Sequence, residues 1–348
     1  MDKMEKKLKK ENGVLSWIKD KWSTNPTVST LFALLVMILI QAVVMGNIAG
    51  SFSGMWGKLG IAWLNILRNN TYAGIIAFGM CLAIISGGID LSVGSILCAL
   101  GEILLWLIDP SHGLLMSMGI TGAPAYAIAI IILIVVGYVL GSVNGLLISR
   151  GNLPPFIATL GTMKIYRSVT QQMTKTFSAE VPAGFKAIAS AKIAGQVIMP
   201  IIYWIVVVIV MHIIFKKTAF GRHVIAIGSN ERAAKLSGIN VAREKRRIYS
   251  ITGIMCAIAT IIYIARIGSM DPANAGNGYE MDAIAAVVVG GTAMSGGRGS
   301  IIGAFIGMLI MGCMNNILNS VGIPTFLTDA VKGAIIIFAV MLQKKEKV

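Results

Sequence analysis

Long apolar stretches recur along the whole chain and are separated by short polar connections. Eight of them are long enough to cross about 30 Å of hydrocarbon as helices. Two more are shorter or interrupted; one opens with Pro154-Pro155, and the other is rich in Ala, Val and Gly. The ten stretches cover residues 28–48, 72–87, 91–108, 125–148, 154–170, 197–214, 248–266, 282–294, 300–319 and 326–342. This pattern predicts an all-α polytopic membrane protein with about ten transmembrane helices, some of them short or broken.

Positive charge gathers in segments that ten crossings place on one side of the membrane. Seven Lys precede Asn25, nine Lys or Arg lie in 215–247, and three more Lys lie in the tail. The connections 109–124 and 320–325, on the other side, contain no Lys or Arg, although 171–196 carries three Lys. Apart from 171–196, the distribution follows the positive-inside rule and predicts that both termini are cytoplasmic.

Composition supports the same division of the chain. Apolar residues make up 56% and charged residues 13%, and the mean hydropathy is +0.79. In soluble domains, apolar residues make up about 45–50% and charged residues about 25%. The net charge of +15 would suggest nucleic acid in a soluble protein. Here it reflects topology, so the expected partner is the lipid bilayer and not nucleic acid. We expect a cytoplasmic segment (1–27), a transmembrane domain (28–342) containing the cytoplasmic loop 215–247, and a cytoplasmic tail (343–348).

Motifs that would mark an enzyme do not occur in the sequence. It contains no GxxxxGK[ST] phosphate-binding loop, no HExxH, no GxSxG and no dinucleotide fingerprint. The three His are scattered. We therefore expect no catalytic residue, no metal site and no cofactor in this chain, and we disfavour an intramembrane enzyme.

Small residues spaced four apart mark helix faces that pack closely. Gly137, Gly141 and Gly145 form one such stripe, and Gly303 and Gly307 form another. In lipid, small residues at this spacing let two helix backbones approach each other. Both stripes are therefore predicted to be helix contacts.

Two Ser-Gly-Gly sequences join apolar stretches with almost no loop between them. Ser86–Ser95 reads SGGIDLSVGS and places Asp90 among apolar neighbours; a carboxylate at membrane depth needs water, protein or a partner. It is either a broken helix in a transport pathway or a tight turn in which Asp90 or Ser92 caps the next helix. Ser295-Gly296-Gly297 repeats Ser86-Gly87-Gly88 at an offset of 209 residues, which is either a trace of internal duplication or a common turn sequence that occurs twice. Asn144 lies within another span, where it faces either the pathway or a neighbouring helix.

The basic loop 215–247 contains a predicted helix of about two turns. Asn230 is a good N-cap, Ala233, Ala234 and Leu236 are good helix formers, and Gly238 is a stop signal. So short a helix is marginal by itself in water. It is either docked in a groove on another protein or part of a solvated loop.

Four motifs together carry a resemblance to a known family. They are Ser86–Ser95, NGLLISRGNLPPFIATLGTM from Asn144 to Met163, FGRHVIAIGSNERAAKLSGINV from Phe220 to Val241, and GYEMDAIAAVVVGGTAMSGGRGSIIG from Gly278 to Gly303. The chain resembles the permease subunits of bacterial ABC importers for monosaccharides, the ribose/galactose/xylose-type group. Ser229 replaces the second glycine that this family usually has before its coupling helix.

The resemblance implies a multi-pass protein of the bacterial cytoplasmic (inner) membrane that works in a complex. Its implied partners are a cytoplasmic ABC ATPase, an extracytoplasmic sugar-binding protein and a second permease subunit, in a homo- or heterodimer. It implies coupling to the ATPase through Gly228, Asn230, Glu231, Ala233, Ala234, Leu236, Gly238 and Ile239. The translocation pathway or its gate is expected near Ser86, Gly87, Gly88, Asp90, Ser92, Asn144, Ser295, Gly296 and Gly297.

The expected function is import of a monosaccharide by alternating access, driven by ATP hydrolysis on the partner. Related permeases for nucleosides and other sugar-like solutes have similar patterns, so the substrate stays open. A second hypothesis is a secondary transporter coupled to H⁺ or Na⁺ through Asp90 and Glu102. The small number of acidic residues in the spans and the helix in the basic loop both favour the ATP-driven importer.

Overall fold

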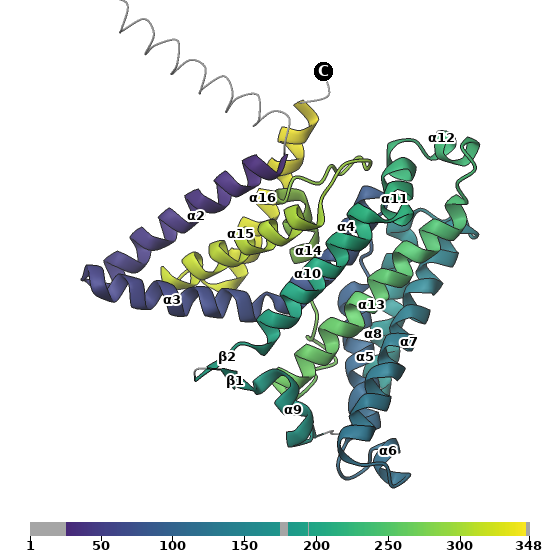
Figure 1. The fold of residues 1–348 in the computed structure, drawn as a ribbon, viewed down its shortest axis with the longest axis horizontal. Helices are drawn as coiled ribbons and strands as arrows, with labels where there is room; N and C mark the ends of the chain where they lie inside the picture. The colour runs from purple at the N-terminus through teal and green to yellow at the C-terminus, as the bar shows by residue number, and fades with distance from the viewer. Residues whose placement is uncertain (1–25, 175–179, 194, 346–348) are drawn as a thin grey trace, which may run out of the picture.

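The computed structural model describes residues 26–174, 180–193 and 195–345, and these are almost entirely helical (Figure 1). The longer helices are α2 (Pro26–Ala49), α3 (Phe52–Asn69), α4 (Thr71–Ile85), α5 (Val93–Ile108), α7 (Gly122–Ser149), α8 (Pro155–Thr174), α10 (Met199–Lys217), α11 (Ala219–Ser229), α13 (Val241–Ile267), α14 (Tyr279–Val289), α15 (Ile301–Ser320) and α16 (Thr325–Lys345). The short elements are α6 (Leu114–Ser117), α9 (Ala183–Ser190), α12 (Glu231–Leu236), β1 (Lys192–Ile193) and β2 (Gln196–Val197), and the two strands pair antiparallel.

Each of the ten predicted apolar stretches contains a helix. Five helices are long and apolar enough to cross a membrane, namely α2, α7, α10, α13 and α15, and α4 and α5 are shorter apolar helices. The helix α13 begins seven residues before its predicted span, because Asn240 caps it and the polar residues up to Arg247 continue the helix. Most of the predicted N-terminal segment 1–27, and residues 346–348 of the predicted tail, lie outside the described residues.

The sequence pattern missed two of the longer helices, α11 and the longer α3. Residues 52–69 form α3, whose N-cap Ser51 accepts a hydrogen bond from the Gly54 amide at 3.2 Å. Lys58 and Arg68 interrupt its apolar run, so it does not appear as a span. It is amphipathic and buries Leu59, Ala62 and Ile66 while the rest of its surface is more exposed.

The helix α4 forms the centre of the bundle, with all of its residues buried. In Figure 1, α2, α3, α14, α15 and α16 lie on one side of it and α5, α7, α8 and α13 on the other. The small-residue stripes form helix contacts, as predicted. A Cβ added at Gly141 or Gly145 would overlap or crowd the backbone of α13, and one added at Gly307 would overlap the backbone of α14.

The two ends of the bundle carry different elements. The helix α12 and the C-terminal end of α16 lie at one end in Figure 1, and α6 and α9 lie at the other. At the end with α6, Asp109 follows α5 and accepts backbone hydrogen bonds from Ser111, His112 and Glu180. Burial raises the pKa of this carboxyl, but those hydrogen bonds outweigh it and hold the pKa below its ordinary value. Asp109 therefore connects two surface segments as a charged acceptor.

Candidate functional site

The two Ser-Gly-Gly breaks meet near the end of the bundle that carries α12. The Gly297 amide donates a hydrogen bond to the Ile85 carbonyl oxygen at 2.8 Å. Gly296 and Gly297 both have positive φ, at 81° and 76°, a region that side chains rarely adopt. The end of α4 and the turn after α14 are thereby joined directly through their backbones.

Gly228 adds a third backbone to this junction. It lies in the last turn of α11, and a Cβ there would overlap the Ile85 carbonyl oxygen and lie 2.6 Å from the Gly297 nitrogen. Only a residue without a side chain allows these three segments to approach so closely. We call Ile85, Gly228 and Gly297 the glycine junction.

A polar pocket of about 350 Å³ lies beside the glycine junction. It brings part of the predicted pathway together with part of the predicted coupling segment. Its lining residues are Ser86, Gly87, Gly88, Ile148, Pro155, Ile227, Gly228, Ser229, Asn230, Glu231, Lys245 and Tyr249. The tight turn after α4 and the approach to α12 therefore share one opening.

The predicted two-turn helix is present as α12, and its cap is formed as expected. The Asn230 side-chain oxygen accepts a hydrogen bond from the Ala233 amide at 3.0 Å. Ala234 is buried in a small cluster with Ile227 and Val241, against which Ile239 packs. Ala234 and Ile239 therefore help to hold the helix against the bundle.

The outer face of α12 is available to a partner. Leu236 is 90% exposed, and Ala233 is also exposed. Glu231, another predicted coupling residue, forms an ion pair of 2.7 Å with Lys245 at the start of α13. This ion pair adds a second connection between α12 and the helix that follows it.

The remaining pathway residues form a separate, closed cluster. Asp90 accepts hydrogen bonds from the Ser92 amide at 2.9 Å and from the Ser92 hydroxyl at 2.6 Å. The Asn144 amide group donates to the Ser92 hydroxyl at 2.7 Å. The side chains of Asp90, Ser92 and Asn144 are fully buried in this conformation, so their predicted place beside a translocation pathway stays a prediction. Asp90 fixes the tight turn before α5, as the second interpretation of this segment predicts.

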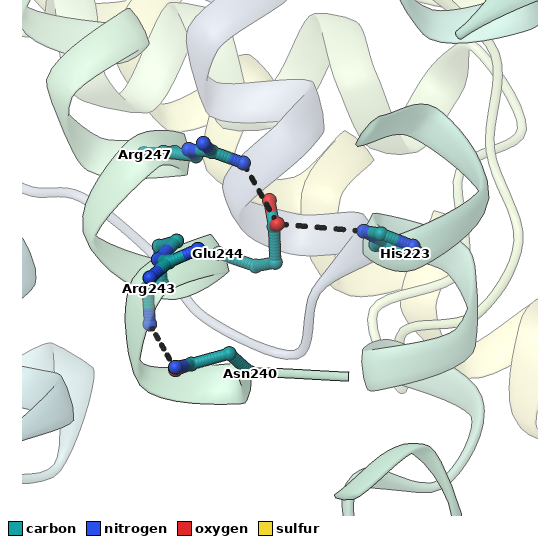
Figure 2. A network of polar contacts seen from close by, with 5 residues as sticks. All are labelled: His223, Asn240, Arg243, Glu244 and Arg247. Atoms are coloured by element: carbon teal, nitrogen blue, oxygen red, sulfur yellow. Dashed lines mark hydrogen bonds and ion pairs between the residues drawn. The ribbon is translucent and has the colours of Figure 1, made fainter. Parts of the chain in front are cut away.

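A polar network joins α11 to α13 and was missed in the sequence. Figure 2 shows Glu244 pointing toward both His223 and Arg247. Its Oε1 accepts from the Arg247 guanidinium at 2.9 Å and lies 3.4 Å from His223 Nδ1. Asn240 caps the same helix through the Arg243 amide at 3.0 Å. A buried carboxylate thus holds α11, the helix before α12, to α13. Nothing in the sequence indicates this network, because the charges of this segment are distributed like those of any basic loop.

Arg167 is a second residue that sequence reasoning missed. From α8 it donates hydrogen bonds to the carbonyl oxygens of Pro272 at 3.2 Å and Ala275 at 2.7 Å, and to Asn277 Oδ1 at 3.1 Å. These contacts hold the loop before α14. A single arginine in a span of mixed polarity gave no signal of this role, because its acceptors are mostly backbone oxygens about one hundred residues away.

Comparisons with known proteins place the chain in a family. The family described as "Branched-chain amino acid transport system / permease component" matches residues 62–340. The ribose import permease protein RbsC of Bacillus subtilis (strain 168) is 43% identical over 286 residues, which cover 81% of this chain and 84% of that protein. The galactose/methyl galactoside import permease protein MglC of Escherichia coli (strain K12) is 36% identical over 290 residues, covering 80% and 84%.

A third relative is also a sugar permease by name, and the comparison with solved structures found no match. The xylose transport system permease protein XylH of Escherichia coli (strain K12) is 32% identical over 348 aligned positions, covering 81% of this chain and 84% of that protein. No solved structure matches the chain. Since the family match spans most of the sequence and each of these relatives aligns over about four fifths of it, the chain belongs to this family of transport-system permease components.

Proposed function

We propose that this chain is the transmembrane permease subunit of an ATP-driven importer that moves a monosaccharide across the bacterial cytoplasmic membrane by alternating access. Relatives named for ribose, galactose or methyl galactoside, and xylose support the monosaccharide class. The five long apolar helices support a multi-pass location in that membrane.

The glycine junction is the observation that carries the mechanism. Gly228 lies directly before α12 and packs against the backbones of Ile85 and Gly297. A displacement of α12 by a partner therefore reaches the turn after α4 and the turn after α14 without passing through flexible side chains. These turns connect α4 to α5 and α14 to α15, so their movement changes how these helices are placed in the bundle.

The exposed face of α12 is the proposed seat of a cytoplasmic ATPase. An apolar side chain as exposed as Leu236 fits a groove on a partner better than it fits water. The basic residues of 215–247 support a cytoplasmic position for this end. The C-terminal end of α16 lies at the same end in Figure 1, which agrees with cytoplasmic termini.

The other partners follow from the same assignment. A sugar-binding protein would dock at the opposite end, where Arg167 holds the loop before α14. A second permease subunit, identical or closely related, would complete the translocation pathway. In the conformation described here Asp90 and Asn144 are closed off, so alternating access requires the helices around them to separate. We assign no covalent chemistry to this chain.

The test is uptake by proteoliposomes that contain the assembled complex and enclose ATP. Labelled ribose, galactose and xylose are each offered with the binding protein, and uptake of one of them that depends on the ATPase is expected. Deleting residues 233–238 should abolish sugar-dependent ATP hydrolysis while the permease still inserts into the membrane. Uptake that needs no ATPase and collapses with an uncoupler would instead support the ion-coupled secondary transporter. Uptake of a nucleoside but of no sugar would refute the substrate class.

A further inference from the structure

A basic pocket opens where α7 ends and α13 begins, apart from the glycine junction. Its volume is about 210 Å³. The lining residues are Leu146, Ser149, Arg150, Asn240, Ala242, Arg243 and Arg246. Three guanidinium groups therefore surround one small opening, and no carboxylate lines it among the described residues.

These arginines are not used by the ion pairs of the neighbouring loop. Glu231 pairs with Lys245 at 2.7 Å and Glu244 with Arg247 at 2.9 Å. Figure 2 shows the Glu244 carboxylate pointing toward His223 on α11. Within the described part of the chain, no ion pair involves the guanidinium groups that line the pocket. Their charge is consequently available to a ligand.

A buried hydroxyl and a helix end add to the anion-binding character. Ser149 Oγ is buried at the pocket and has no hydrogen-bond partner among the described residues. The pocket also receives the N-terminus of α13, a helix of 27 residues, whose dipole favours negative charge. Three arginines, one free hydroxyl and a helix N-terminus form the donor set that phosphate oxygens require.

The position of the pocket indicates that the phosphate it binds belongs to a lipid headgroup. Ile131, Val135, Val139 and Val143 form an exposed apolar stripe along α7. Leu146 and Arg150 continue this stripe by steps of three and four residues, so they lie on the same helix face. An exposed apolar stripe on a membrane helix faces lipid tails, and the pocket lies at its end, where headgroups begin.

We propose that this pocket binds the phosphate headgroup of an anionic phospholipid. Arg150 and Arg246 approach the headgroup from α7 and α13, Arg243 approaches from the first turn of α13, and Ser149 donates its hydroxyl hydrogen. Because Arg246 also packs against Gly145, the bound lipid stabilises the α7–α13 contact. The proposal rests on the membrane location in the proposed function but not on the transported solute.

The experiment measures lipid affinity of the purified full chain in neutral detergent micelles. Fluorescent phosphatidylglycerol and phosphatidylcholine are titrated separately, and the wild type should prefer phosphatidylglycerol. The variant R150Q/R246Q should lose about thirtyfold in affinity for phosphatidylglycerol, the weight of two arginines at an anionic surface, and little for phosphatidylcholine. The control K217Q/R222Q removes the same charge from exposed sites outside the pocket and should keep the preference.

Each other outcome decides the question. Equal losses in the pocket variant and the control would overturn the site, because the effect would then be net charge. Inorganic phosphate bound as tightly as phosphatidylglycerol would make this a site for free phosphate and overturn the lipid assignment. A pocket variant that keeps its preference for phosphatidylglycerol but no longer assembles with the ATPase would also overturn the lipid assignment. If the double variant does not fold, the single variants R150Q and R246Q are measured separately. Each should lose about fivefold in affinity for phosphatidylglycerol. The sugar uptake assay is independent, so either proposal can fail without the other.

Discussion

Replacing Gly228 by Ala tests the glycine junction with a single methyl group. The added Cβ would overlap the Ile85 carbonyl oxygen and lie 2.6 Å from the Gly297 nitrogen. Carbon and nitrogen atoms rest about 3.5 Å apart when not bonded. The overlap with the Ile85 oxygen is the closer of the two contacts, so the end of α11 must withdraw by more than about 1 Å, and the hydrogen bond of 2.8 Å between Gly297 and Ile85 is strained or lost.

The energetic cost can be assembled from three contributions. Crowding a closely packed site costs about 1–3 kcal/mol. Losing the hydrogen bond costs a further 0.5–1.5 kcal/mol or so, and the better helix propensity of Ala returns about 0.5–1 kcal/mol. The expected net loss of stability is about 0.5–4 kcal/mol, which thermal unfolding in detergent can measure.

Gly161→Ala is the matched control. Gly161 lies within α8, and a Cβ there meets nothing within 4 Å, so this variant should be as stable as the wild type or slightly more stable. In the assembled complex, Gly228→Ala should still bind the ATPase, because the exposed face of α12 is intact, but should lose stimulation of ATP hydrolysis by the binding protein. If both variants match the wild type in stability and in stimulation, the glycine junction does not transmit movement.

Three further changes probe separate contacts. Leu236→Glu should abolish co-purification with the ATPase and leave the melting temperature of the isolated permease unchanged, since the side chain is 90% exposed. Arg167→Ala should speed amide hydrogen exchange in residues 273–277 by about tenfold, whereas Lys164→Ala on the same helix should not. Asp109→Asn should cost about 1.5–3 kcal/mol at pH 7, measured by thermal unfolding. Because the folded pKa of Asp109 lies below its ordinary 3.8, this stabilisation is present above about pH 4 and lost as the pH falls through the folded pKa. The melting temperatures of the wild type and of Asp109→Asn should therefore converge as the pH falls. A difference that stays constant with pH would contradict the role of Asp109 as a charged acceptor.

The helices could be predicted because each apolar stretch had the length that its helix needs. The exceptions are α11, within the basic loop, and α3. In α3, Lys58 and Arg68 break the run although the helix still buries Leu59 and Ile66 on one face. A criterion based on mean hydropathy detects helices surrounded by lipid and overlooks amphipathic ones. The cap of α12 was predictable for the opposite reason, since Asn230 and Ala233 are close in sequence and form a local hydrogen bond.

The assembly of the site was not predictable, because it depends on which distant backbones touch. The chain has 39 Gly, and nothing local distinguishes Gly228 from Gly161, although the first is enclosed by two other backbone segments and the second faces open space. The position of Asp90 was equally undetermined. A carboxylate in a broken helix can face a pathway or cap a turn, and the hydrogen bonds to Ser92 show that it does the second in this conformation.

The offset of 209 residues between the two Ser-Gly-Gly sequences relates the two sides of the glycine junction. Shifted by 209 residues, α4 and α5 fall on α14 and α15, and both pairs contain a Ser-Gly-Gly break. The first helices of the two pairs pack against each other, and their breaks meet through the hydrogen bond between Gly297 and Ile85. Gly228 touches both sides of that hydrogen bond, so one element outside the two helix pairs contacts both breaks at once. A partner that moves α12 therefore does not need two points of contact on one permease to act on both breaks, because their common backbone junction already joins them.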